Sequence, residues 1–249
     1  MMMNKTNRLL LGYDLDMWRS YGTKLPVTTD ISPSTNSHMV ICGMSGGGKT
    51  YAEQWYISNL VSEESGICFF ADYKGDDSFS HLRGLPRYYS FKNTLKALDE
   101  AYTILNERLS GSVDRTPITL IWDEYMANIL SLIGEDKKLA ALAMNKVSEI
   151  LLMGRSIGVR LIVTCQRPDA VAFPAGSRLN YGIVVILGAY INSIYEMLMP
   201  DFKIFAEGRI FNRGEGVVLL QGTALHFIKI PTVRDIERMQ ERCIQALSQ

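Results

Sequence analysis

The chain has 249 residues, with 26 lysines and arginines against 26 aspartates and glutamates, and 47% of its residues are hydrophobic. This length and composition are typical of one globular domain, or of one domain with a small extension. The balanced charge excludes a polybasic arm, so any nucleic-acid contact must come from a local basic surface. The longest apolar run, residues 183–187, is too short to cross a membrane, and the first residues lack a signal-peptide core. We therefore expect a cytoplasmic protein.

Short apolar segments alternate with longer amphipathic ones along the chain. The predicted strands cover residues 38–42, 67–71, 87–91, 118–122, 159–165 and 181–187, with a hairpin of residues 217–220 and 224–229. The predicted helices cover residues 49–62, 93–109, 137–157, 191–199 and 233–247. Continuously apolar strands separated by helices predict an α/β fold, with a mainly parallel central sheet covered by helices on both faces.

Cysteine and histidine usage gives no indication of a metal site. The cysteines Cys42, Cys68, Cys165 and Cys243 are widely spaced, and three of them lie inside apolar stretches. We interpret them as small core residues in a reducing compartment, in preference to a disulfide or a metal site. The three histidines likewise show no ligand spacing.

The strongest local signal is the glycine-rich loop between the first predicted strand and helix. It reads Gly43-Met44-Ser45-Gly46-Gly47-Gly48-Lys49-Thr50 and matches the pattern G-x-x-x-x-G-K-[ST]. Its glycines permit a tight turn whose backbone N–H groups surround phosphate oxygens, and the following helix adds its positive N-terminal end. Lys49 is expected to reach the terminal phosphates and Thr50 to bind Mg²⁺, with Tyr51 completing the nucleotide-binding set. The alternative is a flexible glycine-rich connection that happens to contain a lysine.

Two further strands end in polar residues that suit nucleotide hydrolysis. Asp123 follows the strand 118–122 and is the expected second protein ligand of Mg²⁺, while Glu124 is the candidate base for a water that attacks the γ-phosphate. Taken alone, these two acids could merely cap the next helix. Gln166 follows the strand 159–165, and its amide could bond to both phosphate and water. Lys49, Glu124 and Gln166 are thus the predicted catalytic residues within the chain.

Four stretches carry motifs beyond the phosphate loop. They are residues 10–14 (LLGYD), 38–43 (HMVICG), 71–75 (ADYKG) and 154–168 (GRSIGVRLIVTCQRP). Together they resemble motifs of the FtsK/SpoIIIE–HerA family of ring-shaped, RecA-like DNA-pumping ATPases, and the likeness covers roughly residues 10–220.

The resemblance implies a RecA-like P-loop NTPase motor of residues 38–249, with residues 1–37 as an N-terminal extension packed on it. It implies ATP and Mg²⁺ as cofactors and a homo-oligomeric ring, expected to be a hexamer, that grips DNA phosphates in its pore without reading sequence.

This chain also departs from the family pattern. Family members carry an Asp-Ser-Arg triplet where this sequence reads Ile191-Asn192-Ser193-Ile194, so that arginine is missing. The membrane-spanning N-terminus and the C-terminal winged helix of some members are missing as well. We expect a bare motor for conjugative transfer of a mobile element, recruited to the inner face of the membrane by a membrane-anchored partner or a relaxase complex.

In a ring, an arginine of the neighbouring subunit can neutralise charge on the γ-phosphate. Arg178 is the first choice for this role. The next choices are Arg209 and Arg213, and the candidate DNA-contacting cations are Lys74, Arg83 and Arg87. Two other functions stay open, a protein-export motor and a slow nucleotide-gated docking module. DNA-stimulated ATP hydrolysis would separate the DNA motor from the protein-export motor.

Overall fold

The computed structural model describes residues 7–32, 38–63, 66–173 and 175–248. Within these ranges the chain forms one ten-stranded sheet in the order β2-β1-β10-β9-β8-β3-β7-β6-β4-β5. The strands are β1 (Arg8–Asp14), β2 (Pro26–Asp30), β3 (Met39–Cys42), β4 (Ile67–Asp72), β5 (Tyr88–Ser90), β6 (Ile118–Asp123), β7 (Val159–Cys165), β8 (Ile183–Leu187), β9 (Glu215–Leu220) and β10 (Ala224–Lys229).

Strands β8, β3, β7, β6, β4 and β5 run parallel to one another and form the centre and one edge of the sheet. Strand β9 pairs antiparallel with β8, and β10, β1 and β2 extend the sheet by further antiparallel pairs. The central strands are buried along their whole length, which explains their continuously apolar sequences. The predicted α/β fold with a mainly parallel sheet is confirmed.

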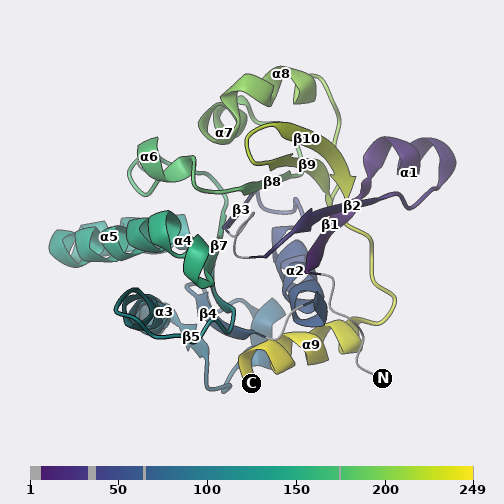
Figure 1. Ribbon diagram of the computed structural model, residues 1–249. Helices are drawn as coiled ribbons and strands as arrows, with labels where there is room; N and C mark the ends of the chain where they lie inside the picture. The colour runs from purple at the N-terminus through teal and green to yellow at the C-terminus, as the bar shows by residue number, and fades with distance from the viewer. Residues whose placement is uncertain (1–6, 33–37, 64–65, 174, 249) are drawn as a thin grey trace.

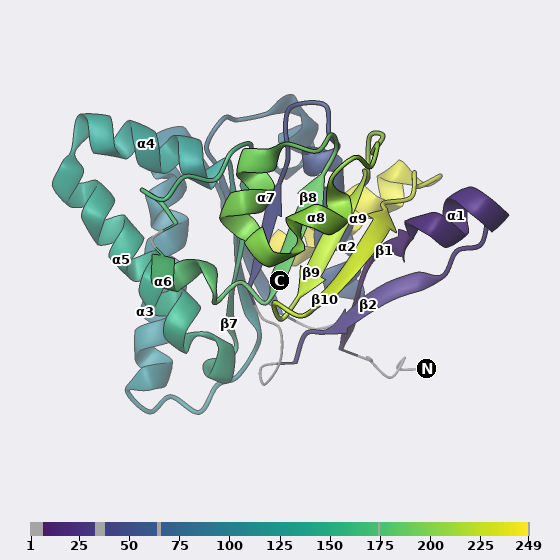
Figure 2. The same cartoon turned by 90° about the horizontal axis from the view of Figure 1, so that it is seen from above.

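Helices cover both faces of this sheet (Figure 1). The helices are α1 (Leu15–Tyr21), α2 (Lys49–Glu63), α3 (Thr94–Leu109), α4 (Tyr125–Glu135), α5 (Lys137–Met153), α6 (Ala175–Arg178), α7 (Asn192–Leu198), α8 (Lys203–Ala206) and α9 (Ile236–Ser248). Helices α2 and α9 pack side by side on one face, and alternate strand residues such as Ile41, Phe70 and Val185 point into that layer. Helices α3, α4, α5 and α7 share the core of the other face (Figure 2).

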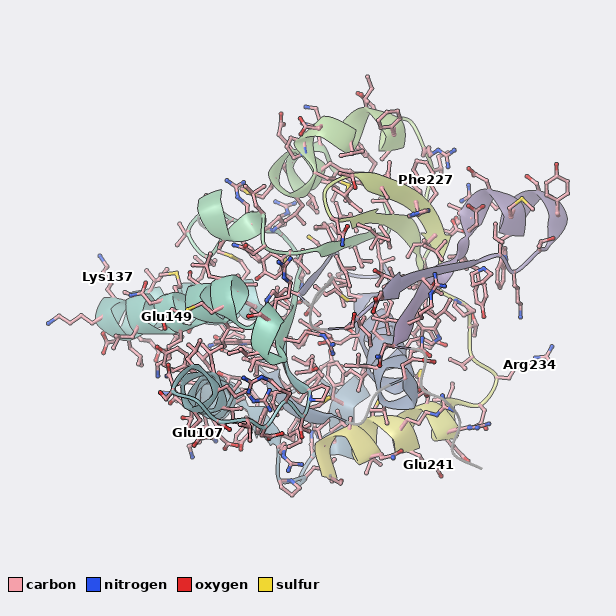
Figure 3. All side chains as sticks on the ribbon, in the orientation of Figure 1. Glu107, Lys137, Glu149, Phe227, Arg234 and Glu241 are labelled. Atoms are coloured by element: carbon pink, nitrogen blue, oxygen red, sulfur yellow. The ribbon has the colours of Figure 1, made fainter. Side chains whose placement is uncertain are left out.

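The charged side chains that surround these layers point outward. Figure 3 shows Lys137 and Arg234 extending from the periphery of the molecule, and Glu107 and Glu241 are exposed on their helices.

Several predicted boundaries were wrong by a few residues, and the end of helix α5 is one of them. Helix α5 ends at Met153, although the sequence predicted a helix to residue 157. A Cβ atom on Gly154 would lie 2.4 Å from the carbonyl oxygen of Val159, so the backbone passes there at a distance that only glycine tolerates. A 3₁₀ turn at residues 155–157 then leads into β7.

The N-terminal segment contributes two strands that the sequence analysis did not predict. Strand β1 pairs with β10, and β2 pairs with β1 at the edge of the sheet. The buried hydroxyl of Tyr56 in α2 donates to the carbonyl of Leu11 in β1 at 2.8 Å, which ties this segment to the helix after the phosphate loop. Residues 1–6 and 33–37 of the predicted extension lie outside the described residues.

Candidate nucleotide site

The glycine-rich loop lies between β3 and α2, as its sequence pattern requires, and its backbone is closely packed from behind. A Cβ atom on Gly43 would lie 2.3 Å from the carbonyl oxygen of Leu187, and one on Gly188 would lie 2.9 Å from the Cα atom of Gly47. The carbonyl of Gly47 accepts a hydrogen bond from the N–H of Gly214 at 2.9 Å. The loop is therefore shaped by the end of β8 and by the turn before β9, in addition to its own glycines.

A cavity of about 160 Å³ opens over this loop. It is lined by Met44, Ser45, Gly46, Gly48, Lys49, Thr50, Tyr51, Lys74, Asp76, Asp123, Glu124, Gln166 and Arg213. The structure thus brings nearly all of the predicted nucleotide and catalytic residues to one place. Gly43 and Gly47 do not line the cavity, because they lie on the side of the loop that packs against the end of β8. Arg178 does not line the cavity either. Asp76 was not singled out from the sequence, Lys74 was predicted to contact DNA, and Arg213 was a candidate for the nucleotide of a neighbouring subunit, whereas here it lines the cavity of its own chain.

The two acids at the end of β6, Asp123 as its last residue and Glu124 just after it, are held by the neighbouring strand. The hydroxyl of Thr164 in β7 donates to Asp123 Oδ1 at 2.5 Å and accepts from the backbone N–H of Glu124 at 3.1 Å. Glu124 adopts the left-handed conformation, with φ 52° and ψ 41°, immediately before α4. A non-glycine residue reaches this conformation at a cost in free energy, and such strain persists where the surrounding structure imposes it.

The carboxylate of Glu124 contacts a glutamine and two lysines that line the cavity. Its Oε1 accepts from Gln166 Nε2 at 3.0 Å and lies 2.9 Å from Lys74 Nζ and 4.0 Å from Lys49 Nζ. Only 9% of the Glu124 side chain is exposed, and Lys49 is equally buried, so water screens that pair little, whereas the Lys74 side chain is 42% exposed and its charge is screened more. Glu124 is therefore no simple helix cap: its side chain makes no capping bond to α4 and faces the phosphate loop.

Two buried acids, Asp123 and Glu53, lie close to each other near Glu124. The pKa of Asp123 is raised to about 6, chiefly by burial. The hydrogen bond from Thr164 acts in the opposite direction and lowers this pKa. Glu53 is one helical turn after Lys49, and burial together with the charges of Asp123 and Asp72 raises the pKa of its carboxyl well above its usual range. Glu53 was not singled out from the sequence. Its position four residues after Lys49 in a predicted helix places the two side chains on the same helix face and was a sign that they are neighbours. The described residues contain no group of three histidines, cysteines or acids arranged to hold a metal ion.

The three candidate arginines lie in different environments. Arg178 in α6 donates to the carbonyl of Met197 at 3.3 Å, away from the cavity of its own chain. Arg209 makes two hydrogen bonds of 3.1 Å to the carboxylate of Asp16. Arg213 lines the nucleotide cavity of its own chain.

The candidate DNA-contacting cations are also engaged within the chain. Lys74 pairs with Glu124, and Arg83 pairs with Asp77 at 2.9 Å on the surface. Arg87 donates to the carbonyl of Leu247 at 3.3 Å. Lys74 is the one of the three that lines the nucleotide cavity.

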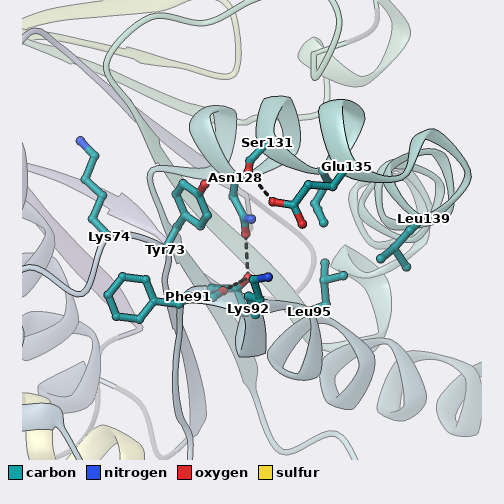
Figure 4. Close-up of a pocket in the computed structure, with 11 residues that line it drawn as sticks. Tyr73, Lys74, Phe91, Lys92, Leu95, Asn128, Ser131, Glu135 and Leu139 are labelled. Atoms are coloured by element: carbon teal, nitrogen blue, oxygen red, sulfur yellow. Dashed lines mark hydrogen bonds between the residues drawn. The ribbon is translucent and has the colours of Figure 1, made fainter.

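A second, more apolar cavity of about 760 Å³ lies beside the first (Figure 4). Its lining consists of Tyr73, Lys74, Phe91, Lys92, Thr94, Leu95, Asn128, Ser131, Leu132, Glu135 and Leu139. At its base Asn128 Oδ1 accepts from Thr94 Oγ1 at 2.7 Å and from Trp122 Nε1 at 3.1 Å. Lys74 lines both cavities, so the turn after β4 forms part of the wall between them.

This phosphate loop, on a mostly parallel sheet with acids at the end of β6, defines the chain as a P-loop NTPase of RecA-like fold. No protein-family model matches the chain. In an alignment 182 residues long, which covers 67% of this chain, it is 29% identical to the FtsK domain-containing protein YdcQ of Bacillus subtilis (strain 168), and it spans 37% of that protein.

Solved structures agree with this assignment of the fold. The conjugation coupling protein TcpA of pCW3, in its monomer form with ATPγS, matches 98% of this chain at a TM-score of 0.71 and 16% identity, and 71% of TcpA is covered. The cytoplasmic domain of the type VII secretion ATPase EccC from Thermomonospora curvata matches 100% of this chain at a TM-score of 0.66 and 18% identity, with 32% of that domain covered. The predicted resemblance to FtsK-type ATPases is confirmed. Across the described part of the chain, no helix has the length and apolar character needed to cross a membrane.

Proposed function

We propose that this chain is an ATPase that hydrolyses ATP with Mg²⁺ and moves DNA through a homo-oligomeric ring, in conjugative transfer of a mobile element. The observation that carries the hydrolytic part is the Glu124 carboxylate, held beside Lys49 over the phosphate loop. The DNA part is supported by the sequence resemblance to the FtsK/SpoIIIE–HerA family and by a conjugation coupling protein among the structural neighbours.

The loop and its lysine would bind the nucleotide. Backbone N–H groups of residues 43–48 and the Lys49 ammonium suit the β- and γ-phosphates. Thr50 and Asp123 line the same cavity and offer a hydroxyl and a carboxylate oxygen. This donor set fits Mg²⁺, which takes few protein ligands and keeps several waters. When bound, the ion would neutralise phosphate charge.

Glu124 would supply the base for hydrolysis. Its Oε1 is occupied by nitrogen donors, which leaves Oε2 for the proton of a water. The oxygen of that water would bond to the γ-phosphorus while the bond from the γ-phosphorus to the bridging oxygen breaks, so ADP and phosphate form. Gln166 would hold the carboxylate on the side of the γ-phosphate.

A ring would complete the site from a second copy. Arg178 lies outside the cavity of its own chain and is our proposed trans-acting arginine, with a hexamer as the proposed assembly. Arg209 and Arg213 are weaker choices, because the first is paired with Asp16 and the second already lines its own cavity. A membrane-anchored partner or a relaxase complex would recruit the ring from the cytoplasm to the inner face of the membrane.

A protein-secretion motor is the second candidate. It is favoured by the type VII secretion ATPase EccC among the structural neighbours. A slow, nucleotide-gated docking module is the third, and it requires that Glu124 does little chemistry.

The test is ATP hydrolysis by wild type, Lys49→Ala and Glu124→Gln, with and without duplex or single-stranded DNA at two salt concentrations. We expect DNA-stimulated hydrolysis by wild type, with loss of both nucleotide binding and hydrolysis in Lys49→Ala. Glu124→Gln should still bind ATP but turn over about 10²- to 10⁴-fold more slowly, because an amide cannot take the proton of the water. Glu107→Gln makes the same change on the exposed surface and should behave as wild type. Full-rate hydrolysis by Glu124→Gln would favour the docking module, and hydrolysis indifferent to DNA would count against the DNA motor.

A further inference from the structure

Lys74 is placed against Glu124 by a turn that is built into the sheet. Strands β4 and β6 are parallel neighbours, and their register pairs Asp72 with Asp123. Lys74 follows Asp72 by two residues and Glu124 follows Asp123 by one, so both side chains leave the same edge of the sheet. The distance of 2.9 Å between Lys74 Nζ and Glu124 Oε1 makes the two side chains an ion pair in direct contact.

The turn that carries Lys74 is held independently of the lysine side chain. The fully buried Asp72 accepts from the N–H of Gly75 at 2.7 Å through one oxygen and from the hydroxyl of Tyr88 at 2.5 Å through the other. Gly75 has φ +66°, and a Cβ atom there would lie 2.8 Å from the ring of Phe91. Since the backbone fixes the turn, a substitution of Lys74 should alter the contact with Glu124 and leave the fold intact.

The contact with Lys74 determines how the carboxylate of Glu124 is oriented. Gln166 donates a hydrogen bond to Oε1 and Lys74 forms an ion pair with the same oxygen, from strands on opposite sides of β6, so a rotation of the carboxylate would break both contacts. Among the described residues, Oε2 has no hydrogen-bond donor.

We propose that Lys74 is a positioning residue for ATP hydrolysis: by binding Oε1 of Glu124 it holds Oε2 ready for the attacking water. This inference rests on the proposed function. Lys74 acts through Glu124, whereas phosphate binding in the ground state falls to Lys49 and the backbone of the loop.

The experiment measures steady-state ATP hydrolysis, without DNA, by wild type, Lys74→Met, Lys74→Arg and Lys92→Met. Lys74→Met should lower kcat by about 10- to 100-fold, the range for the loss of a hydrogen bond to a charged group, with little change in KM. Lys74→Arg should recover much of the rate, because a guanidinium can donate to the same oxygen. Lys92 lines the neighbouring cavity with Lys74 and makes no contact with Glu124, so Lys92→Met should keep the wild-type kcat. Equal thermal unfolding of the variants checks that the fold is unchanged.

A double-mutant cycle separates an action through Glu124 from a direct action on phosphate. Single-turnover hydrolysis is compared for Glu124→Gln alone and for Glu124→Gln with Lys74→Met. If Lys74 acts through the carboxylate, the second substitution should lower the residual rate by less than about twofold, because the carboxylate it positions is already gone.

Three results would overturn this role of Lys74. They are a wild-type or higher kcat in Lys74→Met, a fall in kcat that persists at full size in the Glu124→Gln background, and a failure of Lys74→Arg to restore any rate. Absence of hydrolysis by wild type would overturn the proposed function as well. A wild-type rate in Lys74→Met beside an inactive Glu124→Gln would overturn only the inference about Lys74.

Discussion

Acid should destabilise this protein through one buried histidine at the start of the central strand. His38 is 2% exposed, and its Nδ1 accepts from the backbone N–H of Leu161 at 3.1 Å. Burial, reinforced by the charges of Arg160 and Arg155, lowers the pKa of His38 from 6.5 to about 3. The folded chain therefore keeps this imidazole neutral at pH values where the unfolded chain protonates it.

The expected size of this effect follows from the two pKa values of His38. Because the pKa is lower in the folded chain, the stability conferred by the neutral imidazole is present above pH 6.5 and is lost as the pH falls below it. At pH 5, about 1.5 units below the unfolded pKa, the loss amounts to about 2 kcal/mol in the free energy of unfolding. At pH 7.5 the loss is close to zero.

Urea unfolding at pH 7.5 and pH 5 would measure this loss in wild type and in His38→Asn. The asparagine amide oxygen can accept the bond from Leu161 in place of Nδ1, and the amide does not titrate. Other groups that titrate in this range, such as Asp123, are common to both proteins and cancel in the comparison. Between the two pH values, wild type should lose about 2 kcal/mol more than the variant. Equal losses would refute the argument that His38 stays neutral in the fold.

Three further substitutions, one of them a control, test how the site and the N-terminal strand are held. Gly188→Ala should cost about 1 to 3 kcal/mol and weaken ATPγS binding, because its φ is +85° and its Cβ atom would press on Gly47. Gly22→Ala is the control: its φ is +65° and no atom lies near its Cβ position, so it should cost about 1 kcal/mol and leave ATPγS binding unchanged. Equal ATPγS binding by the two variants would contradict the inference that Gly188 shapes the phosphate loop. Tyr56→Phe should cost about 1 kcal/mol in thermal unfolding, because the buried carbonyl of Leu11 loses its donor, and an unchanged Tm would show that this bond adds no net stability.

Much of the nucleotide site could be predicted from the sequence because it is encoded locally. The loop 43–50 joins one strand to one helix, and Asp123 and Gln166 each follow an apolar strand. Parallel strands bring such ends to one edge of a sheet, so local pattern and general topology were sufficient. The positions of Thr50, Asp123 and Glu124 around one cavity agree with that reasoning, and their chemical roles stay predictions.

The sequence did not predict features that depend on contacts between distant segments. Strand β1 lies between β2 and β10, and its pairing with β10 joins residues that are far apart in the sequence. The residues of β1 give no periodic pattern strong enough to identify the strand by themselves. The contact of Lys74 with Glu124 depends on the register between β4 and β6, which one strand cannot reveal. Helix α4 was not predicted by any pattern of its own residues, and the only indication of it was the alternative role of Asp123 and Glu124 as caps of a following helix.

The close backing of the phosphate loop also bears on the order in which the protein forms during synthesis. The loop emerges from the ribosome before Gly188 and the turn at Gly214, which pack against it. Strand β1 must likewise wait for β10, which lies near the other end of the described chain. Contacts between segments that are far apart in the sequence form slowly compared with helices. During synthesis the glycine-rich loop is therefore made before the segments that complete the nucleotide site.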